Sequence, residues 1–146
     1  MSNKLIGIAS DHAGFEMKEY LITWLQSQGY IIKDFGAYNS ERSDYPDFGH
    51  ALAIAVENGE CQLGIGICGT GVGINVVMNK HQGIRAAICW RPEIARLDRE
   101  HNDANILSLP GRFLSFQEGI CIVKTFLTTD FEGERHVQRI EKIPIQ

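Results

Sequence analysis

The feature that most constrains this chain is an apolar run that ends on a cysteine and passes directly into alternating glycines. Leu63–Ile67 contains only apolar residues and glycine, Cys68 follows, and Gly69, Gly71 and Gly73 precede an apolar helical pattern. This order predicts a buried strand, a tight loop and a helix. Glycines in such a loop leave backbone N–H groups free to point at one anion, and the start of the helix adds partial positive charge there.

The position of Cys68 has two interpretations. The positive end of a helix stabilises a thiolate, which would make Cys68 a nucleophile or a base. A core cysteine in an ordinary strand-to-helix turn is the alternative. Gly64–Gly69 also matches the dinucleotide-binding pattern GxGxxG, but two of its glycines fall inside the predicted strand and no acidic residue ends a strand about twenty residues further on. Nucleotide binding by this route is therefore disfavoured.

Strand and helix patterns alternate along the whole chain with short connections. Strands are predicted over Leu5–Ala9, Tyr30–Phe35, Leu63–Ile67, Ile84–Cys89 and Asn105–Leu109. Helices are predicted over 15–28, 47–58, 72–80, 92–99, 115–128 and 133–143. This alternation predicts one α/β domain over residues 1–146, a three-layer αβα sandwich around a five-stranded parallel sheet of Rossmann-like or flavodoxin-like type.

Composition and charge exclude several classes of partner. The chain is 44% hydrophobic and 22% charged, as in ordinary globular proteins. Its net charge of -4 gives no electrostatic reason to expect nucleic acid or an anionic membrane as a partner. No apolar run reaches the ~18 residues of a membrane span, and residues 1–5 lead into a strand pattern without a signal sequence. We therefore expect a cytoplasmic protein.

The spacing of cysteine and histidine predicts no metal site. The four cysteines are Cys61, Cys68, Cys89 and Cys121. They form no CxxC pair and no zinc-ligand spacing with the five histidines. Three histidines have no neighbouring signal and are interpreted as surface or packing residues: His50, His81 and His136.

Polar residues lie near the ends of several predicted elements. Asp11 and His12 follow the first strand, the loop Cys68–Gly73 follows the third, and His101 and Asn102 follow the helix before the fifth. Because ligands of parallel α/β sheets bind beyond the carboxyl ends of the strands, we expect all three segments on one rim. The ordinary alternatives are an N-cap aspartate beside a surface histidine, and a histidine that interacts with a helix dipole.

Arginines near the end of the chain are candidates for binding an anion. Arg135 and Arg139 are four residues apart, so on a helix they share a face and can converge on one phosphate. Because Glu134 lies beside them, a solvated charged helix face is an equally good interpretation. Arg112 is a further arginine in a predicted loop. Together with a thiol and a loop of N–H donors, these groups fit proton abstraction beside a carbonyl of a phosphorylated substrate.

Six segments, in this order along nearly the whole chain, carry a resemblance to a known family. They are Ser10–Gly14, Ser43–Pro46, Ile67–Ile74, Gly83–Ala86, Arg99–Asn105 and Glu132–Arg139. They resemble ribose-5-phosphate isomerase B, whose wider family includes galactose-6-phosphate isomerase subunits. The resemblance implies reversible conversion of ribose 5-phosphate and ribulose 5-phosphate through a cis-enediolate, in the non-oxidative branch of the pentose phosphate pathway, without metal or organic cofactor.

The resemblance also implies a role for each matching residue in the reaction. Cys68 would be the base that moves a proton between C2 and C1, and Thr70 would assist proton traffic on the oxygens. His101 would be the acid that opens the furanose ring, assisted by Asp11. The enediolate would be held by the backbone N–H groups of Gly69, Thr70, Gly71, Val72 and Gly73.

Substrate binding and assembly are implied in the same way. The phosphate would be bound by His12, Arg135 and Arg139, with Arg112 reaching in from a second subunit, and the sugar by Tyr45 and Asn102. The assembly would be a homodimer or a dimer of dimers with a shared active site. The C-terminal helix, about 133–143, would lie at the dimer interface.

Two segments depart from the family pattern, and two other functions stay open. Trp90-Arg91 follows the fourth strand where smaller or more polar residues are expected, and Asn75–Met78 replaces a run richer in Ser and Ala. Some family members use a glutamate after the glycine loop as base, but no carboxylate lies between Thr70 and Lys80 here, so Cys68 is expected to serve as the base.

The alternative functions are an isomerase of a six-carbon aldose phosphate, such as allose or galactose 6-phosphate, and a non-catalytic sugar-phosphate sensor.

Overall fold

The computed structural model describes residues 4–145, and the first three residues, on which the expectation of no signal sequence partly rests, lie outside them. All five described strands are parallel, in the order β2-β1-β3-β5-β4. The strands are β1 Leu5–Ser10, β2 Ile31–Asp34, β3 Leu63–Cys68, β4 Ala86–Ile88 and β5 Ile106–Pro110. The helices are η1 His12–Gly14, α1 Phe15–Ser27, α2 Tyr45–Glu57, α3 Val72–Met78, α4 Pro92–Asn102, α5 Phe116–Thr128 and α6 Arg135–Glu141.

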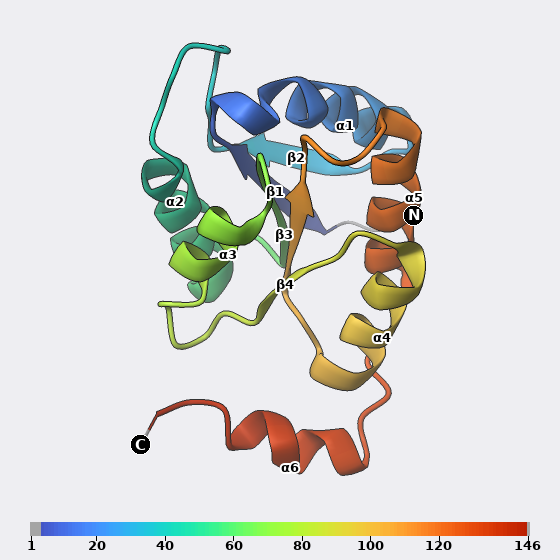
Figure 1. The fold of residues 1–146 in the computed structure, drawn as a ribbon. Helices are drawn as coiled ribbons and strands as arrows, with labels where there is room; N and C mark the ends of the chain where they lie inside the picture. Colours follow the sequence, from blue (N-terminus) through green and yellow to red (C-terminus); the bar gives the residue numbers. More distant parts are fainter. Residues whose placement is uncertain (1–3, 146) are drawn as a thin grey trace.

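Helices cover both faces of the sheet, so the predicted three-layer αβα architecture is confirmed (Figure 1). Helices α2 and α3 pack together on one face, and α1, α5 and α4 cover the other. Two buried apolar clusters correspond to these two interfaces. Helix α6 lies outside the layers, next to α4. No helix among residues 4–145 is long and apolar enough to cross a membrane.

The central strand β3 is buried along its whole length, as its continuous apolar pattern predicts for a strand covered on both faces. Gly66 explains how α3 approaches this strand so closely. A Cβ atom at Gly66 would lie 2.7 Å from Cε of Met78, the fully buried last residue of α3. Glycine at this position therefore allows the helix to pack closely against the strand.

Two helix boundaries differ from the sequence prediction, and both differences matter for the site. Helix α2 begins at Tyr45 instead of residue 47, because Pro46 suits the first turn of a helix and Asp44 stands at the N-cap. Helix α4 continues to Asn102 instead of Arg99 and ends at Asp103, whose φ of 46° is left-handed. His101 and Asn102 therefore belong to the last turn of α4 and not to a turn after it.

Candidate functional site

A cavity of about 390 Å³ opens at the carboxyl edge of the sheet, between the ends of β1 and β3. These adjacent strands lead to connections on opposite sides, so the cavity occupies the switch point where α/β sheets bind ligands. We call it the Cys68 pocket. Its lining residues are Asp11, His12, Ala13, Tyr45, Cys68, Gly69, Thr70, Val72, Gly73 and Arg112.

Cys68 is the last residue of β3, and it lines this pocket. Its side chain belongs to the α2–α3 apolar cluster, and only 4% of the residue is exposed. The backbone around it is held by the next loop, since Gly111 N–H donates to the Cys68 carbonyl (2.9 Å) and Arg112 N–H donates to that of Gly69 (3.0 Å). The thiol is thus held at a fixed position beside the glycine loop.

Gly71 has a backbone conformation that favours glycine. Its φ is 76°, in the left-handed region, and a Cβ atom there would lie 3.2 Å from the carbonyl carbon of Leu109. This sharp turn starts α3 at Val72, directly over the pocket. The predicted arrangement of strand, tight glycine loop and helix is confirmed.

Asp11 and His12 are fixed by local hydrogen bonds. Oδ1 of Asp11 accepts from Ala13 N–H (2.9 Å) and Gly14 N–H (3.2 Å), so Asp11 caps the short η1 helix while also lining the pocket. His12 is held by Ser43, whose hydroxyl accepts from His12 N–H at 3.1 Å and whose carbonyl lies 3.2 Å from Nδ1 of His12. Ser43 thus orients His12, a contact that spacing along the chain did not reveal.

Three further side chains shape the mouth of the pocket. The Thr70 hydroxyl accepts from Val72 N–H (3.2 Å), which fixes it at the start of α3. The Tyr45 ring packs against Gly73, where a Cβ atom would lie 2.7 Å from Cζ of the ring. Arg112 lines the pocket of its own chain, and the expectation that it reaches in from a second subunit is wrong.

The remaining predicted site residues belong to the end of α4 and to α6, and both lie at the opposite edge of the sheet (Figure 1). Helix α4 ends just before β5, and Ile106 at the start of β5 pairs with Gly64, whereas Pro110 at its end pairs with Cys68. A helix that leads into a parallel strand ends at that strand's amino edge. The expectation that His101 and Asn102 share a rim with Cys68 is therefore wrong within one chain.

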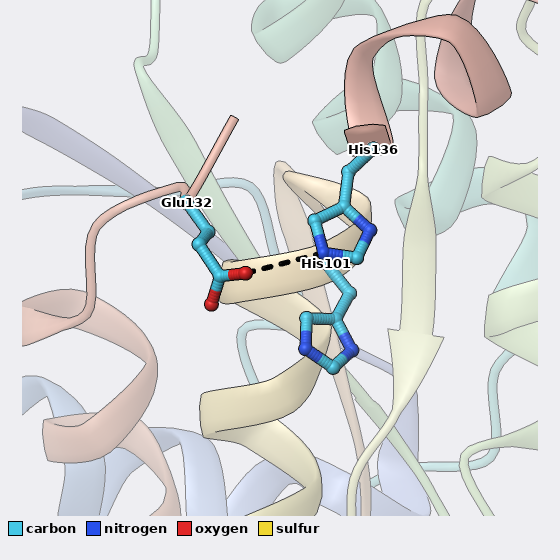
Figure 2. Close-up of side chains that lie close together, drawn as sticks. All are labelled: His101, Glu132 and His136. Carbon is cyan, nitrogen blue, oxygen red and sulfur yellow. Dashed lines mark ion pairs between the residues drawn. The ribbon is translucent and has the colours of Figure 1, made fainter. Parts of the chain in front are cut away.

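Helix α6 extends this second region, which we call the His101 edge. Arg135 and Arg139 are both exposed on α6, and Arg135 lies 3.6 Å from Glu132. The rings of His101 and His136 stack with centroids 4.5 Å apart, and His136 is 3% exposed (Figure 2). The interpretation of His136 as a packing residue is right about its burial but misses its contact with His101. Sequence spacing also gave no signal for Glu132.

Helix α4 also carries a buried carboxyl group that faces the sheet. Burial raises the pKa of Asp98 to about 7, with Arg99 and Arg85 opposing the shift. Burial also raises the pKa of the neighbouring Cys89 thiol, whose Sγ lies 3.9 Å from Oδ2 of Asp98. Neither residue lines the Cys68 pocket, so we interpret this pair as part of the packing of α4.

The two segments that depart from the family pattern do not line the Cys68 pocket. Trp90 and Arg91 line a larger hollow of about 750 Å³ between α4 and α5, which shares no lining residue with the Cys68 pocket. Oδ1 of Asn75 accepts from the Ser108 hydroxyl (2.8 Å), which links α3 to β5. Met78 fills the space over β3, whereas Val76 in the same segment is exposed.

Comparison with known proteins identifies the class of protein that carries this fold and pocket. Residues 6–143 match the model of the ribose/galactose isomerase family. The chain therefore belongs to this family. It is 43% identical over 140 residues to ribose-5-phosphate isomerase B of Escherichia coli, covering 96% of this chain and 94% of the relative.

Two solved structures show the same architecture. A ribose 5-phosphate isomerase of Thermotoga maritima superposes with a TM-score of 0.96 at 45% identity, covering 98% of this chain and 99% of that one. Ribose-5-phosphate isomerase B of Mycoplasma genitalium, solved with bound ribulose-5-phosphate, gives a TM-score of 0.91 at 42% identity, covering 95% and 93%. Both likenesses cover at least 95% of this chain.

Proposed function

We propose that this chain is an aldose–ketose isomerase that interconverts D-ribose 5-phosphate and D-ribulose 5-phosphate. The observation that carries the proposal is that Cys68 lines a pocket together with residues of the glycine loop that starts α3. The family match supports the reaction class, and the ribulose-5-phosphate bound to the Mycoplasma genitalium relative supports the substrate. The reaction belongs to the non-oxidative branch of the pentose phosphate pathway.

The Cys68 pocket supplies the groups for proton transfer. Sγ of Cys68 removes the proton from C2 of the open-chain aldose, and the charge moves onto the carbonyl oxygen at C1. N–H groups of the loop 69–73 stabilise the oxygen of the enediolate. Thr70 passes the hydroxyl proton between the two oxygens, and Cys68 returns its proton to C1. No co-reactant is needed, because the hydrogen removed from one carbon is replaced at the next.

The His101 edge supplies ring opening and anchoring, and we infer that it does so for a second copy of the chain. His101 donates a proton to the ring oxygen, with Asp11 of the other chain assisting at the anomeric hydroxyl. Arg135 and Arg139 hold the phosphate beside His12 and Arg112. Asn102 contacts the sugar from this edge, as Tyr45 does from the pocket. In one chain the two sets lie at opposite edges, which supports a homodimer, or a dimer of dimers, with shared sites and α6 at the interface.

Exposed apolar side chains beside the pocket support such an interface. Val72 and Val76 are four residues apart on α3, so they share a face, and they are 52% and 51% exposed. Tyr45 at the mouth of the pocket is also partly exposed. Apolar groups in this position suit contact with another subunit better than contact with water.

Isotope exchange tests the reaction directly. Ribose 5-phosphate is incubated with the protein in heavy water, and the recovered sugars are followed by NMR. We expect ribulose 5-phosphate to appear and deuterium to enter C2 of the aldose and C1 of the ketose. Absence of both at high protein concentration contradicts the isomerase assignment for this substrate, and binding without exchange identifies a sensor.

The same assay addresses the six-carbon alternative. Allose 6-phosphate and galactose 6-phosphate are run in parallel, because the family model spans ribose and galactose isomerases. Faster exchange with either sugar than with ribose 5-phosphate overturns the substrate assignment and leaves the reaction class standing. The cytoplasmic location and the absence of nucleic-acid partners stay predictions from the sequence.

A further inference from the structure

A cluster of three potential metal ligands lies at the His101 edge, outside the Cys68 pocket. It consists of His101 on the last turn of α4, Glu132 in the segment before α6, and His136 in the first turn of α6. One ligand atom from each lies within 4.8 Å of the other two. Figure 2 shows the Glu132 carboxylate directed at the His136 ring, with the His101 ring beside it.

His136 provides an independent sign that a ligand is missing between these side chains. The residue is 3% exposed, yet its Nε2 atom is buried and makes no hydrogen bond to any residue among 4–145. A buried ring nitrogen without a partner is unfavourable, and native proteins seldom leave one. The nearest charged group recorded for it, Oε1 of Glu132, is 3.4 Å away.

This separation suits two ligands of one metal ion better than a hydrogen bond. Zinc binds imidazole nitrogen and carboxylate oxygen at about 2.0–2.2 Å, which places two ligands of a tetrahedral ion about 3.3 Å apart. His101 supplies the third ligand atom, which lies within 4.8 Å of the other two and moves closer when a metal ion binds. Rotation about the last torsion of a histidine meets a broad energy profile.

The backbone already holds the three side chains in place. Glu132 N–H donates to the Glu100 carbonyl (3.0 Å), which ties the segment to the turn of α4 that carries His101. The competing partner of Glu132 is Arg135, at 3.6 Å, but its side chain is 60% exposed and is free to turn into solvent. Displacing this weak pair costs little, because exposed ion pairs contribute little.

We propose that His101, Glu132 and His136 form a binding site for a divalent transition metal ion of the zinc class. Two imidazoles and one carboxylate suit Zn²⁺, Co²⁺, Ni²⁺ or Cu²⁺, whereas Mg²⁺ and Ca²⁺ prefer oxygen ligands. Three protein ligands leave one coordination position open to water or to an anion. A bound metal ion coordinates a ring nitrogen of His101. Occupancy of this site therefore determines whether His101 is free to act as an acid.

Metal binding is measured on the full chain after removal of metal with a chelator. Co²⁺ is titrated while its visible absorption is recorded, and Zn²⁺ is titrated by calorimetry. We expect saturable binding of one ion per chain and a cobalt spectrum typical of tetrahedral nitrogen and oxygen ligation. The proposal is overturned if neither Co²⁺ nor Zn²⁺ shows saturable binding.

Two variants and a matched control locate the site. Glu132→Gln changes a partly exposed residue, so this variant is expected to fold. His136→Ala changes a buried residue, and its secondary structure is therefore checked by circular dichroism. Each is expected to lower zinc affinity by at least the roughly tenfold seen when outer groups of metal sites are removed. The control is His50→Ala with His81→Ala, which removes a second histidine pair whose Nδ1 and Nε2 atoms lie 2.7 Å apart. Loss of binding in the control, or unchanged binding in both variants, overturns the assignment.

A consequence for turnover rests on the proposed function and is measured separately. Zn²⁺ at the site is expected to inhibit isomerisation in proportion to occupancy, with full recovery on adding chelator and with weaker inhibition in Glu132→Gln. Inhibition that follows the binding curve supports control through His101. Occupancy without inhibition leaves the metal site standing and overturns the role of His101 in turnover.

Discussion

The Cys68 pocket and the His101 edge differ in how their groups are held. In the pocket, the thiol and the N–H donors belong to a strand end and a loop fixed by hydrogen bonds and by a left-handed glycine. At the His101 edge, Arg135 and Arg139 are exposed side chains on a short helix that touches the body through α4. The reacting end of the site is therefore positioned by the backbone, as proton transfer requires, whereas the anchoring end consists of exposed side chains.

The largest effect is expected from removing the thiol of the Cys68 pocket. Cys68→Ala should lower kcat by about 10²–10⁴-fold while substrate still binds, as loss of a general base does. Steady-state kinetics and direct binding of ribose 5-phosphate measure the two effects separately. Cys121→Ala, which removes an exposed thiol on α5, is the matched control. A near-normal rate in Cys68→Ala would show that the base is elsewhere.

The next effect separates ring opening from proton transfer. His101→Asn should slow conversion of ribose 5-phosphate by roughly 10²-fold, because the closed ring then lacks its acid. Deuterium exchange at C1 of ribulose 5-phosphate should continue near the native rate, since this ketose has no ring to open and Cys68 is intact. Equal loss of both rates would contradict the division of labour between the two regions.

The anchoring role of α6 predicts a change in binding more than in chemistry. Arg139→Ala should raise KM by about 10–100-fold, the range expected for one lost hydrogen bond to a charged group, with kcat within a few-fold of native. Lys124→Ala, at an exposed cation on α5, serves as the control for loss of a positive charge. An unchanged KM in Arg139→Ala would remove this arginine from the phosphate site.

The smallest effect concerns the backbone of the Cys68 pocket. Gly71→Ala should lower the free energy of unfolding by about 1–3 kcal/mol, because the new side chain must adopt a left-handed φ. Gly59→Ala is the matched control, since Gly59 also has a positive φ (85°) but nothing lies within 4 Å of its Cβ position. Chemical denaturation should show a larger loss for Gly71→Ala, through the close approach of Leu109. Equal losses of unfolding free energy in the two variants would contradict a tight contact between Gly71 and Leu109.

Much of this structure follows from local patterns in the sequence. Strand β3, the glycine loop and the capping role of Asp11 depend on neighbouring residues, so periodicity and residue type were enough to predict them. The end of α4 was not predictable in this way, because it depends on a left-handed Asp103. The contact of His136 with His101 joins segments distant in the chain, and no spacing rule predicts which distant side chains meet.

The central claim is that one active site takes its thiol from one chain and its His101 from another. Co-expression of Cys68→Ala and His101→Asn chains with different tags allows the mixed dimer to be isolated. If the site is shared, the mixed dimer has one intact site and one site with both substitutions, so it should recover about half of native activity although each parent is nearly inactive. Activity no higher than that of the parents would contradict the account.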